Sequence, residues 1–161
     1  MKSCSIILKH RKDIRISGDK VIQIKQQAIK DCSIIVPGSK SYTHRLLIAT
    51  ALSAGKCIID NCLKSEDTLL TMKALRQMGV KIEEKDNITT VWGKNGKFDP
   101  CKEPIYLANS GTSMRLLTGI AALGEGIYTL TGTKRMQERP IQDLLDGLSQ
   151  INISAKSIKG T

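Results

Sequence analysis

The segment 37–45 combines the residue types that bind anions at the start of a helix. It reads Pro-Gly-Ser-Lys-Ser-Tyr-Thr-His-Arg and leads into an apolar, alanine-rich stretch. A glycine-containing turn that feeds a helix directs backbone N–H groups at a ligand, and Lys40, Ser41 and Arg45 add two cations and a hydroxyl there. The pattern predicts a site for a phosphate or a carboxylate.

Two other interpretations fit parts of the same segment. A nucleotide-binding P-loop has glycine directly before its lysine and another five residues earlier, whereas Ser39 precedes Lys40 and 32–36 contain no glycine. That interpretation therefore fails. The other is that Ser39 or Ser41 only caps the helix while Lys40 and Arg45 lie on a solvated face. Spacing within this one segment does not decide between the cap and the anion site.

A second polar turn, 109–115, favours the anion site. It reads Asn-Ser-Gly-Thr-Ser-Met-Arg and again offers small residues that let a ligand approach the backbone at a strand-to-helix turn. Two such turns on a pseudo-symmetric framework can face a single cleft.

A third basic cluster occupies 132–140, ahead of another helix. Arg139 stands beside Glu138, and we expect the two to form a structural ion pair. Arg135 is then the better partner for a phosphate or carboxylate, because a guanidinium binds either group through two hydrogen bonds.

Hydrophobic patterning predicts an α/β fold built from two copies of a βαβαββ unit. The first copy is expected to have strands at 33–36, 57–60, 80–83 and 89–92 and helices at 46–54 and 65–79. The second is expected to have strands at 105–108 and 127–130, a helix at 114–123, and a helix with an apolar stripe over 141–151 whose first turn holds Pro140.

An internal repeat supports this division. Arg45-Leu46-Leu47 recurs 70 positions later as Arg115-Leu116-Leu117, and Ala-Leu-Arg-Gln at 74–77 recurs as Gly-Leu-Ser-Gln at 147–150. We therefore expect a quasi-symmetric arrangement. The predicted division is N-terminal strands at 1–30, which we assign to a partner domain, a first unit at 31–98, and a truncated second unit at 99–161. Within 1–30, the apolar alternations 5–8 and 21–24 flank a turn at 17–19.

Bulk composition points to an anionic partner. The 161 residues include 25 Lys and Arg against 15 Asp and Glu, a formal net charge of +10. Aromatic residues make up only 3%, and no nucleic-acid motif is present, so small anionic metabolites are favoured over nucleic acid. The five cysteines form no metal or disulfide spacing, and no segment is long and apolar enough for a bilayer. We expect reduced thiols and a cytoplasmic protein.

Four ordered motifs carry a family resemblance over roughly 30–156: Pro-Gly-Ser-Lys-Ser-x-x-x-Arg at 37–45, Ser-Glu-Asp at 65–67, Asn-x-Gly-Thr-x-x-Arg at 109–115, and Arg-Met-x-Glu-Arg-Pro-Ile at 135–141. The chain resembles the 5-enolpyruvylshikimate-3-phosphate synthases. A sibling family that uses UDP-N-acetylglucosamine typically has Lys-Asn where this sequence has Lys40-Ser41, and it remains a distant alternative. A non-catalytic basic module that binds nucleic acid is a second alternative, motivated by charge alone.

The resemblance implies enolpyruvyl transfer from phosphoenolpyruvate to shikimate 3-phosphate in the shikimate pathway, without metal or organic cofactor and without a nucleic-acid or membrane partner. It implies Lys40 as the catalytic residue. The substrate-binding residues that it implies are Lys40, Ser41 and Arg45 for shikimate 3-phosphate, Gly111 and Arg135 for phosphoenolpyruvate, and Asn109 and Thr112 in support. His44 is expected on the helix surface. The family's remaining ligands would lie beyond Thr161, in a C-terminal part of the same enzyme, so the chain alone is expected to be inactive.

Overall fold

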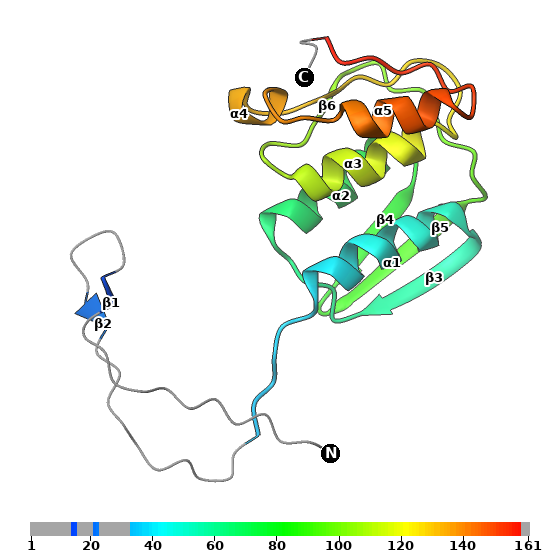
Figure 1. Ribbon diagram of the computed structural model, residues 1–161. Coiled ribbons are helices and arrows are strands. Elements are labelled where there is room, and N and C mark those ends of the chain that lie inside the picture. Colours follow the sequence, from blue (N-terminus) through cyan, green and yellow to red (C-terminus); the bar gives the residue numbers. More distant parts are fainter. Residues whose placement is uncertain (1–13, 16–20, 23–32, 159–161) are drawn as a thin grey trace. The chain divides into compact units, whose positions relative to one another are not determined.

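The computed structural model describes residues 14–15, 21–22 and 33–158 (Figure 1). The chain divides after Ile35 into two units. In the first, β1 (Ile14–Arg15) pairs antiparallel with β2 (Val21–Ile22). The sequence predicts a hairpin here, and Val21–Ile22 is one of its strands; the strand expected at 5–8 lies outside the described residues.

The second unit begins with two helices on one face of an antiparallel sheet. The sheet has the strand order β3 (Ala54–Asp60), β5 (Ile88–Lys94), β4 (Lys81–Lys85). Helix α1 (Lys40–Leu52) packs on β5 and β3, and α2 (Glu66–Gln77) packs beside α1 (Figure 1). These elements agree in type and order with those predicted over 46–92.

The rest of the second unit places a third helix against α2. Strand β6 (Ile105–Tyr106) pairs parallel with β7 (Leu130–Thr131), and α3 (Gly111–Ala121) connects them. The short helix α4 (Lys134–Gln137) and α5 (Gln142–Ser149) follow. Because α2 contacts both α1 and α3, the three helices form one layer (Figure 1).

Each of these three helices begins at a serine cap. The hydroxyl oxygens of Ser39, Ser65 and Ser110 accept hydrogen bonds from backbone N–H groups in the first turn of α1, α2 and α3. At Ser65 the cap is reciprocal, because Thr68 returns a side-chain contact to the cap N–H and completes a capping box. The serines fix where each helix starts, and so which residues occupy its N-terminal turn.

Fully buried apolar side chains fill the space between helices and sheet. Leu47 of α1, Met72 and Leu75 of α2, Leu117 of α3 and Val91 of β5 all belong to this core. The predicted repeat is visible here, since Leu47 and Leu117 occupy equivalent positions 70 residues apart and both are inaccessible to solvent. Among the described helices, none is long and apolar enough to cross a membrane.

The strand predicted at 33–36 is wrong. These residues take no part in a strand, and Ile34, Ile35 and Val36 are exposed, Ile35 completely. β-branched residues favour extended backbone, but a strand also requires hydrogen bonds from a neighbour. Within the described residues, no strand pairs with this segment.

The boundaries of the second copy also differ from the prediction. The strand predicted at 105–108 contains only Ile105 and Tyr106, and the strand predicted at 127–130 begins only at Leu130. Helix α4 was not predicted; it starts at a Thr133 cap inside what the sequence indicates as a loop. Pro140 precedes α5 instead of occupying its first turn, and Ile151 of the apolar stripe is exposed.

Candidate functional site

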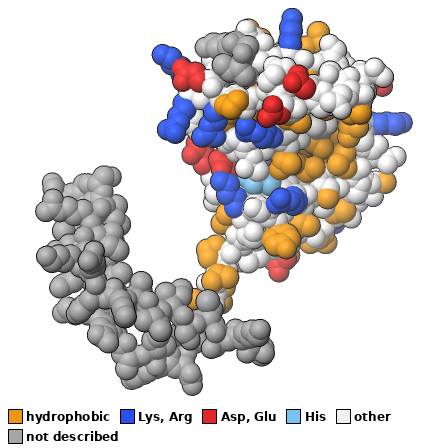
Figure 2. Space-filling view, viewed as in Figure 1, with side chains coloured by type: hydrophobic (Ala, Val, Ile, Leu, Met, Phe, Trp, Pro, Cys, Tyr) orange, Lys and Arg blue, Asp and Glu red, His pale blue; other side chains and the backbone are white. Residues whose placement is uncertain are grey.

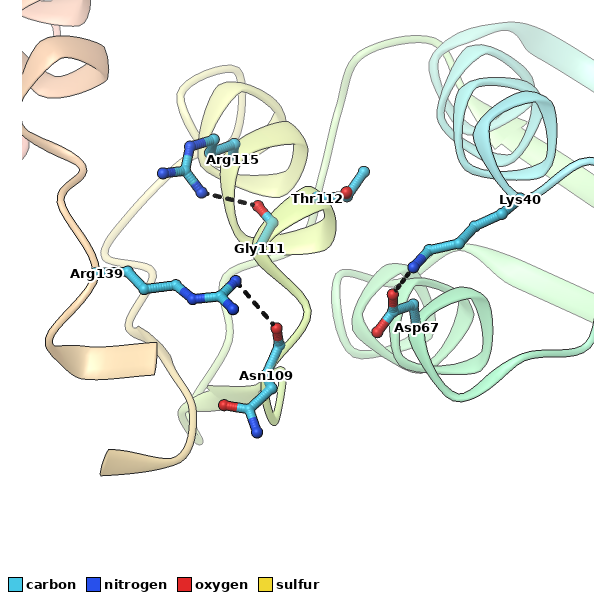
Figure 3. Close-up of a pocket in the computed structure, with 7 residues that line it drawn as sticks. All are labelled: Lys40, Asp67, Asn109, Gly111, Thr112, Arg115 and Arg139. Carbon is cyan, nitrogen blue, oxygen red and sulfur yellow. Dashed lines mark hydrogen bonds and ion pairs between the residues drawn. The ribbon is translucent and has the colours of Figure 1, made fainter. Parts of the chain in front are cut away.

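The N-termini of α1, α2 and α3 meet at a pocket of about 460 Å³ (Figure 3). It is lined by Lys40, Asp67, Asn109, Gly111, Thr112, Arg115 and Arg139. Lys40 begins α1, Asp67 lies in the first turn of α2, and the others come from the turn into α3, from α3 itself and from the segment between α4 and α5. Two polar turns that the sequence separates by 70 residues therefore do face one pocket.

The start of α1 is held close to α2 by a tight backbone contact. A Cβ atom on Gly38 would lie 2.1 Å from the carbonyl oxygen of Asn61, so only glycine fits at this approach. The Thr43 hydroxyl accepts a 3.0 Å hydrogen bond from the backbone N–H of Leu63, in the same loop. These contacts bring Lys40 to the N-terminus of α2.

Lys40 and Asp67 form an ion pair inside the pocket (Figure 3). The Lys40 ammonium, through its hydrogen bond, is the main cause that lowers the pKa of the Asp67 carboxyl, and burial opposes this effect. The nearby Ser110 hydroxyl and the His44 side chain lower that pKa further. Asp67 is therefore a carboxylate at neutral pH and orients the Lys40 ammonium.

Two guanidinium groups flank Gly111 on the other side of the pocket. Arg115 donates from Nη1 to the Gly111 carbonyl at 3.3 Å and from Nη2 to the Pro140 carbonyl at 2.8 Å. Arg139 donates from Nη1 to the Asn109 carbonyl at 3.4 Å (Figure 3). Each guanidinium has five N–H donors, so both retain donors for an anion.

Charge is unbalanced in this pocket, which holds three cations and one carboxylate. Helix N-termini add partial positive charge, since their first N–H groups have no partner within the helix. Figure 2 shows Lys and Arg side chains gathered around the middle of this face, with a few acidic side chains among them. The arrangement can bind phosphate or carboxylate groups and stabilise negative charge that develops between them.

Four of the seven predicted site residues line the pocket: Lys40, Asn109, Gly111 and Thr112. The other three, Ser41, Arg45 and Arg135, are exposed and lie outside its lining. Arg45 donates to the backbone carbonyl of Ser41 at 3.1 Å, one turn earlier in α1, and Arg135 lies on α4. Their roles in substrate binding remain predictions.

The expected ion pair between Glu138 and Arg139 is not among those formed by the described residues. Arg139 instead reaches back to the turn before α3 and lines the pocket. Neighbours in sequence do not have to point the same way, and the bend between α4 and α5 directs Arg139 inward. The sequence analysis expected Arg139 to form an ion pair and favoured Arg135 as the anion-binding residue. Of these two arginines, Arg139 is the one that lines the pocket.

Two further lining residues carried signals that the sequence-based prediction did not use. Asp67 belongs to the Ser-Glu-Asp motif at the start of the helix predicted at 65–79, and its position in the first turn of α2 directs its carboxylate at Lys40. Arg115 is the repeat equivalent of Arg45, which was selected. The equivalence of Arg115 to Arg45 would have been enough to select Arg115 as a candidate site residue.

His44 is buried, with 1% of its surface exposed, so its expected place on the helix surface is wrong. One face of α1 packs on the sheet and a second on α2, where Nδ1 of His44 lies 3.0 Å from the Thr71 hydroxyl. The hydrophobic pattern of α1 indicates one buried face and does not reveal that α2 packs against a second one.

Two polar turns that lead into helices and face one cationic pocket, on an α/β framework, define a class of protein suited to small anionic ligands. The chain belongs to the EPSP synthase (3-phosphoshikimate 1-carboxyvinyltransferase) family, whose family model matches residues 24–161.

Individual relatives agree with this assignment. A 3-phosphoshikimate 1-carboxyvinyltransferase of Methanothermobacter thermautotrophicus is 42% identical over 125 residues, covering 78% of this chain and 30% of the relative. A chloroplastic 3-phosphoshikimate 1-carboxyvinyltransferase 1 of Nicotiana tabacum is 37% identical over 157 residues, covering 91% and 30%. The solved EPSP synthase of Acinetobacter baumannii superposes with a TM-score of 0.73 at 32% identity, covering 80% of this chain and 30% of that one. The chain thus spans about 30% of the length of these relatives.

Proposed function

We propose that the protein containing this chain transfers the enolpyruvyl group of phosphoenolpyruvate to the 5-hydroxyl of shikimate 3-phosphate, and that this chain supplies one wall of the substrate site. The pocket with three cations and one carboxylate at three helix N-termini carries the proposal. Each substrate has a phosphate, with a charge of about −1.5 to −2 at neutral pH, and a carboxylate. Bringing them together requires a strongly positive site. The activity in the relatives' names supports this choice of reaction.

The reaction makes one C–O bond and breaks another. The 5-oxygen of shikimate 3-phosphate loses its proton and bonds to C2 of phosphoenolpyruvate, while C3 gains a proton, giving a tetrahedral intermediate. Elimination then removes a proton from C3 and releases inorganic phosphate from C2. Negative charge is concentrated around the reacting carbon throughout, so fixed cations are the main contribution a protein can make.

Within this chain, we assign Lys40 to the position between the two anions. Its ammonium is held by Asp67 and can neutralise charge on both substrates or assist proton transfer as the intermediate forms. The guanidinium groups of Arg115 and Arg139 are assigned to a carboxylate or phosphate through paired hydrogen bonds. Gly111 lets an anion approach the first turn of α3.

The remaining assignments rest on the family resemblance. Ser41 and Arg45 would bind shikimate 3-phosphate from the exposed side of α1, and Arg135 would reach phosphoenolpyruvate from α4. Asn109 and Thr112 would support the second substrate from the turn into α3.

Phosphate release by the complete protein, measured with both substrates together, tests this proposal. We expect release only when shikimate 3-phosphate and phosphoenolpyruvate are both present. Release with UDP-N-acetylglucosamine in place of shikimate 3-phosphate would assign the protein to the sibling reaction. Binding of single-stranded or duplex nucleic acid at physiological salt, without any response to shikimate 3-phosphate, would refute both.

The 161-residue chain alone is expected to bind shikimate 3-phosphate weakly and not to turn over. Lys40 is about half exposed and Asp67 about a quarter exposed, so the pocket is open to water and each ion pair contributes little. Calorimetric titration at two salt concentrations, followed by a turnover assay, measures both expectations. Tight, salt-insensitive binding or steady turnover would mean that the site is complete within this chain.

A further inference from the structure

The turn that leads into α3 is fastened to residues 132–139, which contain α4 and are called the α4 segment below. Thr133 donates from its backbone N–H to the Ala108 carbonyl at 3.1 Å. A Cβ atom on Gly132 would lie 2.3 Å from that carbonyl oxygen, so the two backbones are in close contact. Each side also contributes a residue to the pocket lining, Asn109 from the turn and Arg139 from the α4 segment.

The Thr133 side chain adds a bond to the Asn109 side chain. The Thr133 hydroxyl oxygen accepts a hydrogen bond from the backbone N–H of Met136 at 3.4 Å and so caps α4. The same hydroxyl donates its proton to Oδ1 of Asn109. One hydroxyl therefore fixes both the start of α4 and the side chain of a pocket residue.

This bond determines which end of the Asn109 amide is available to a ligand. A carboxamide has an oxygen that accepts hydrogen bonds and an NH₂ group that donates them. If the amide were turned round, its NH₂ group would donate to the Thr133 oxygen, and the hydroxyl proton would have no acceptor among the described residues. With Oδ1 bonded to Thr133, the NH₂ group makes no hydrogen bond within the described structure and can donate to a ligand.

The backbone of Asn109 is held by the same segment. Arg139 donates from Nη1 to the Asn109 carbonyl at 3.4 Å (Figure 3). Ala108, the residue before, has a φ of +44°, a conformation in which its Cβ atom crowds the following carbonyl oxygen. The Thr133 N–H bonds to the carbonyl of this left-handed residue. The turn and the α4 segment thus hold each other at three points, two of which involve Thr133.

An anion in the pocket would meet two different donors at this place. Arg139 retains N–H donors beyond the one it gives to the Asn109 carbonyl. The Asn109 NH₂ group adds a neutral donor, and a hydrogen bond to an ionised acceptor is stronger than one between neutral groups. With the amide turned round, its oxygen would face the anion and repel it.

We propose that Thr133 is a positioning residue: its hydroxyl holds Oδ1 of Asn109 against the α4 segment and so presents the Asn109 NH₂ group to an anion in the pocket. Thr133 is not among the residues that line the pocket, and it acts through Asn109. The identity of the anion as one of the two proposed substrates rests on the proposed function, whereas the orientation of the amide does not.

Nuclear magnetic resonance of the ¹⁵N-labelled 161-residue chain, titrated with inorganic phosphate at low salt, tests this without turnover. In the wild type, the side-chain NH₂ signals of Asn109 should shift with the same midpoint as the guanidinium signals of Arg139, because both groups bind one anion. Thr133→Val keeps the side-chain shape and removes the hydroxyl. We expect phosphate affinity in this variant to fall about fivefold, as for one interaction with a charged group in a site open to water.

Two single variants are the controls. Thr133→Ser restores the hydroxyl and should restore wild-type phosphate affinity. Thr118→Val makes the same chemical change in α3, where the hydroxyl donates to the Met114 carbonyl at 2.8 Å, and should leave the affinity unchanged.

A double-mutant cycle with Asn109→Ala separates positioning of the amide from capping of α4. In the Asn109→Ala background, Thr133→Val should cause no further loss of phosphate affinity, because the side chain that Thr133 positions is absent. A role through the α4 cap and Arg139 would instead weaken binding by the same factor in both backgrounds.

Three results would overturn the proposal: Asn109 NH₂ signals that do not respond to phosphate in the wild type, unchanged affinity in folded Thr133→Val, or an equal loss in both backgrounds of the cycle. If Thr133→Val does not fold, the wild-type titration still decides. Absence of enolpyruvyl transfer by the complete protein, with the expected phosphate results in this chain, would refute the proposed function alone.

Discussion

Replacing Gly111 by alanine should weaken anion binding without weakening the fold. A Cβ atom at this position would lie 2.8 Å from Nη1 of Arg139 and 3.3 Å from Nη1 of Arg115. The Arg139 guanidinium would have to move by roughly 0.7 Å to reach an ordinary contact of about 3.5 Å. The guanidinium is the end of a flexible side chain, so the substitution should displace the guanidinium and leave the packing of α3 unchanged.

The expected loss can be bounded from the character of the pocket. A hydrogen bond to a charged group contributes about 1.5–3 kcal/mol when sheltered, and an exposed ion pair about 0.2–1 kcal/mol. The Arg139 side chain is intermediate in exposure. A loss of about 1 kcal/mol is therefore expected, which corresponds to roughly fivefold weaker binding. Calorimetric titration of the 161-residue chain with inorganic phosphate at low salt measures it.

Gly119→Ala is the matched control. It lies in the same helix, and a Cβ atom there would meet nothing within 4 Å. Phosphate affinity should not change, while the free energy of unfolding should rise by about 0.5–1 kcal/mol because alanine restricts the unfolded chain. Unchanged affinity in Gly111→Ala would mean that Arg139 does not contact the anion. An equal loss in both variants would trace the effect to the helix and not to the pocket.

Three further predictions concern catalysis, pH and the core. Lys40→Met in the complete protein should lower kcat as well as raise KM for both substrates in steady-state assays; a change in KM alone would limit Lys40 to binding. The free energy of unfolding, measured by urea titration, should fall as pH drops below about 6.5, because the pKa of His44 is lowered in the fold and the unfolded chain is protonated there first. It should fall further below about 4, because the pKa of Asp67 is also lowered in the fold and the unfolded chain again takes up the proton first. His44→Gln should remove the first decline and keep the second, and an identical profile would contradict the assignment. Leu47→Ala and Leu117→Ala should each cost about 2–5 kcal/mol by the same titration, and a cost near zero at either would argue against equivalent core positions.

The sequence predicted those elements whose signals are local. Helix α2 has a serine cap, acidic residues in its first turn and a glycine just past its end, and all three signals are present in the sequence. In the structure this glycine, Gly79, has the positive φ of +83° that such a helix end requires. The strands β4 and β5 flank a two-residue turn at 86–87, which fixes their register through the pair Lys85 and Ile88. The segment 33–36 has an equally strong local signal and forms no strand, because strand formation also depends on a neighbour far along the chain.

The same distinction applies to the pocket. Lys40 and Gly111 could be selected because each lies at a helix start marked by its own turn. Arg139 enters the pocket only because the chain bends between α4 and α5, and His44 is buried only because α2 packs over α1. No pattern within either segment records these tertiary contacts, so sequence reasoning preferred Arg135 and an exposed histidine.

The pocket is built by a repeat but is not itself repeated. Arg45 and Arg115 hold the same helix position, and each donates to a carbonyl four residues earlier, yet only Arg115 lines the pocket. By the same spacing of 70, Lys40 corresponds to Ser110, which is buried beneath the pocket instead of lining it. Duplication therefore supplies two helix N-termini that border one pocket, and differences between the copies supply the side chains that line it. One copy contributes the Lys40 cation of the pocket, and the other contributes at the equivalent position the buried Ser110 hydroxyl, which caps α3 and contacts the Ser113 hydroxyl.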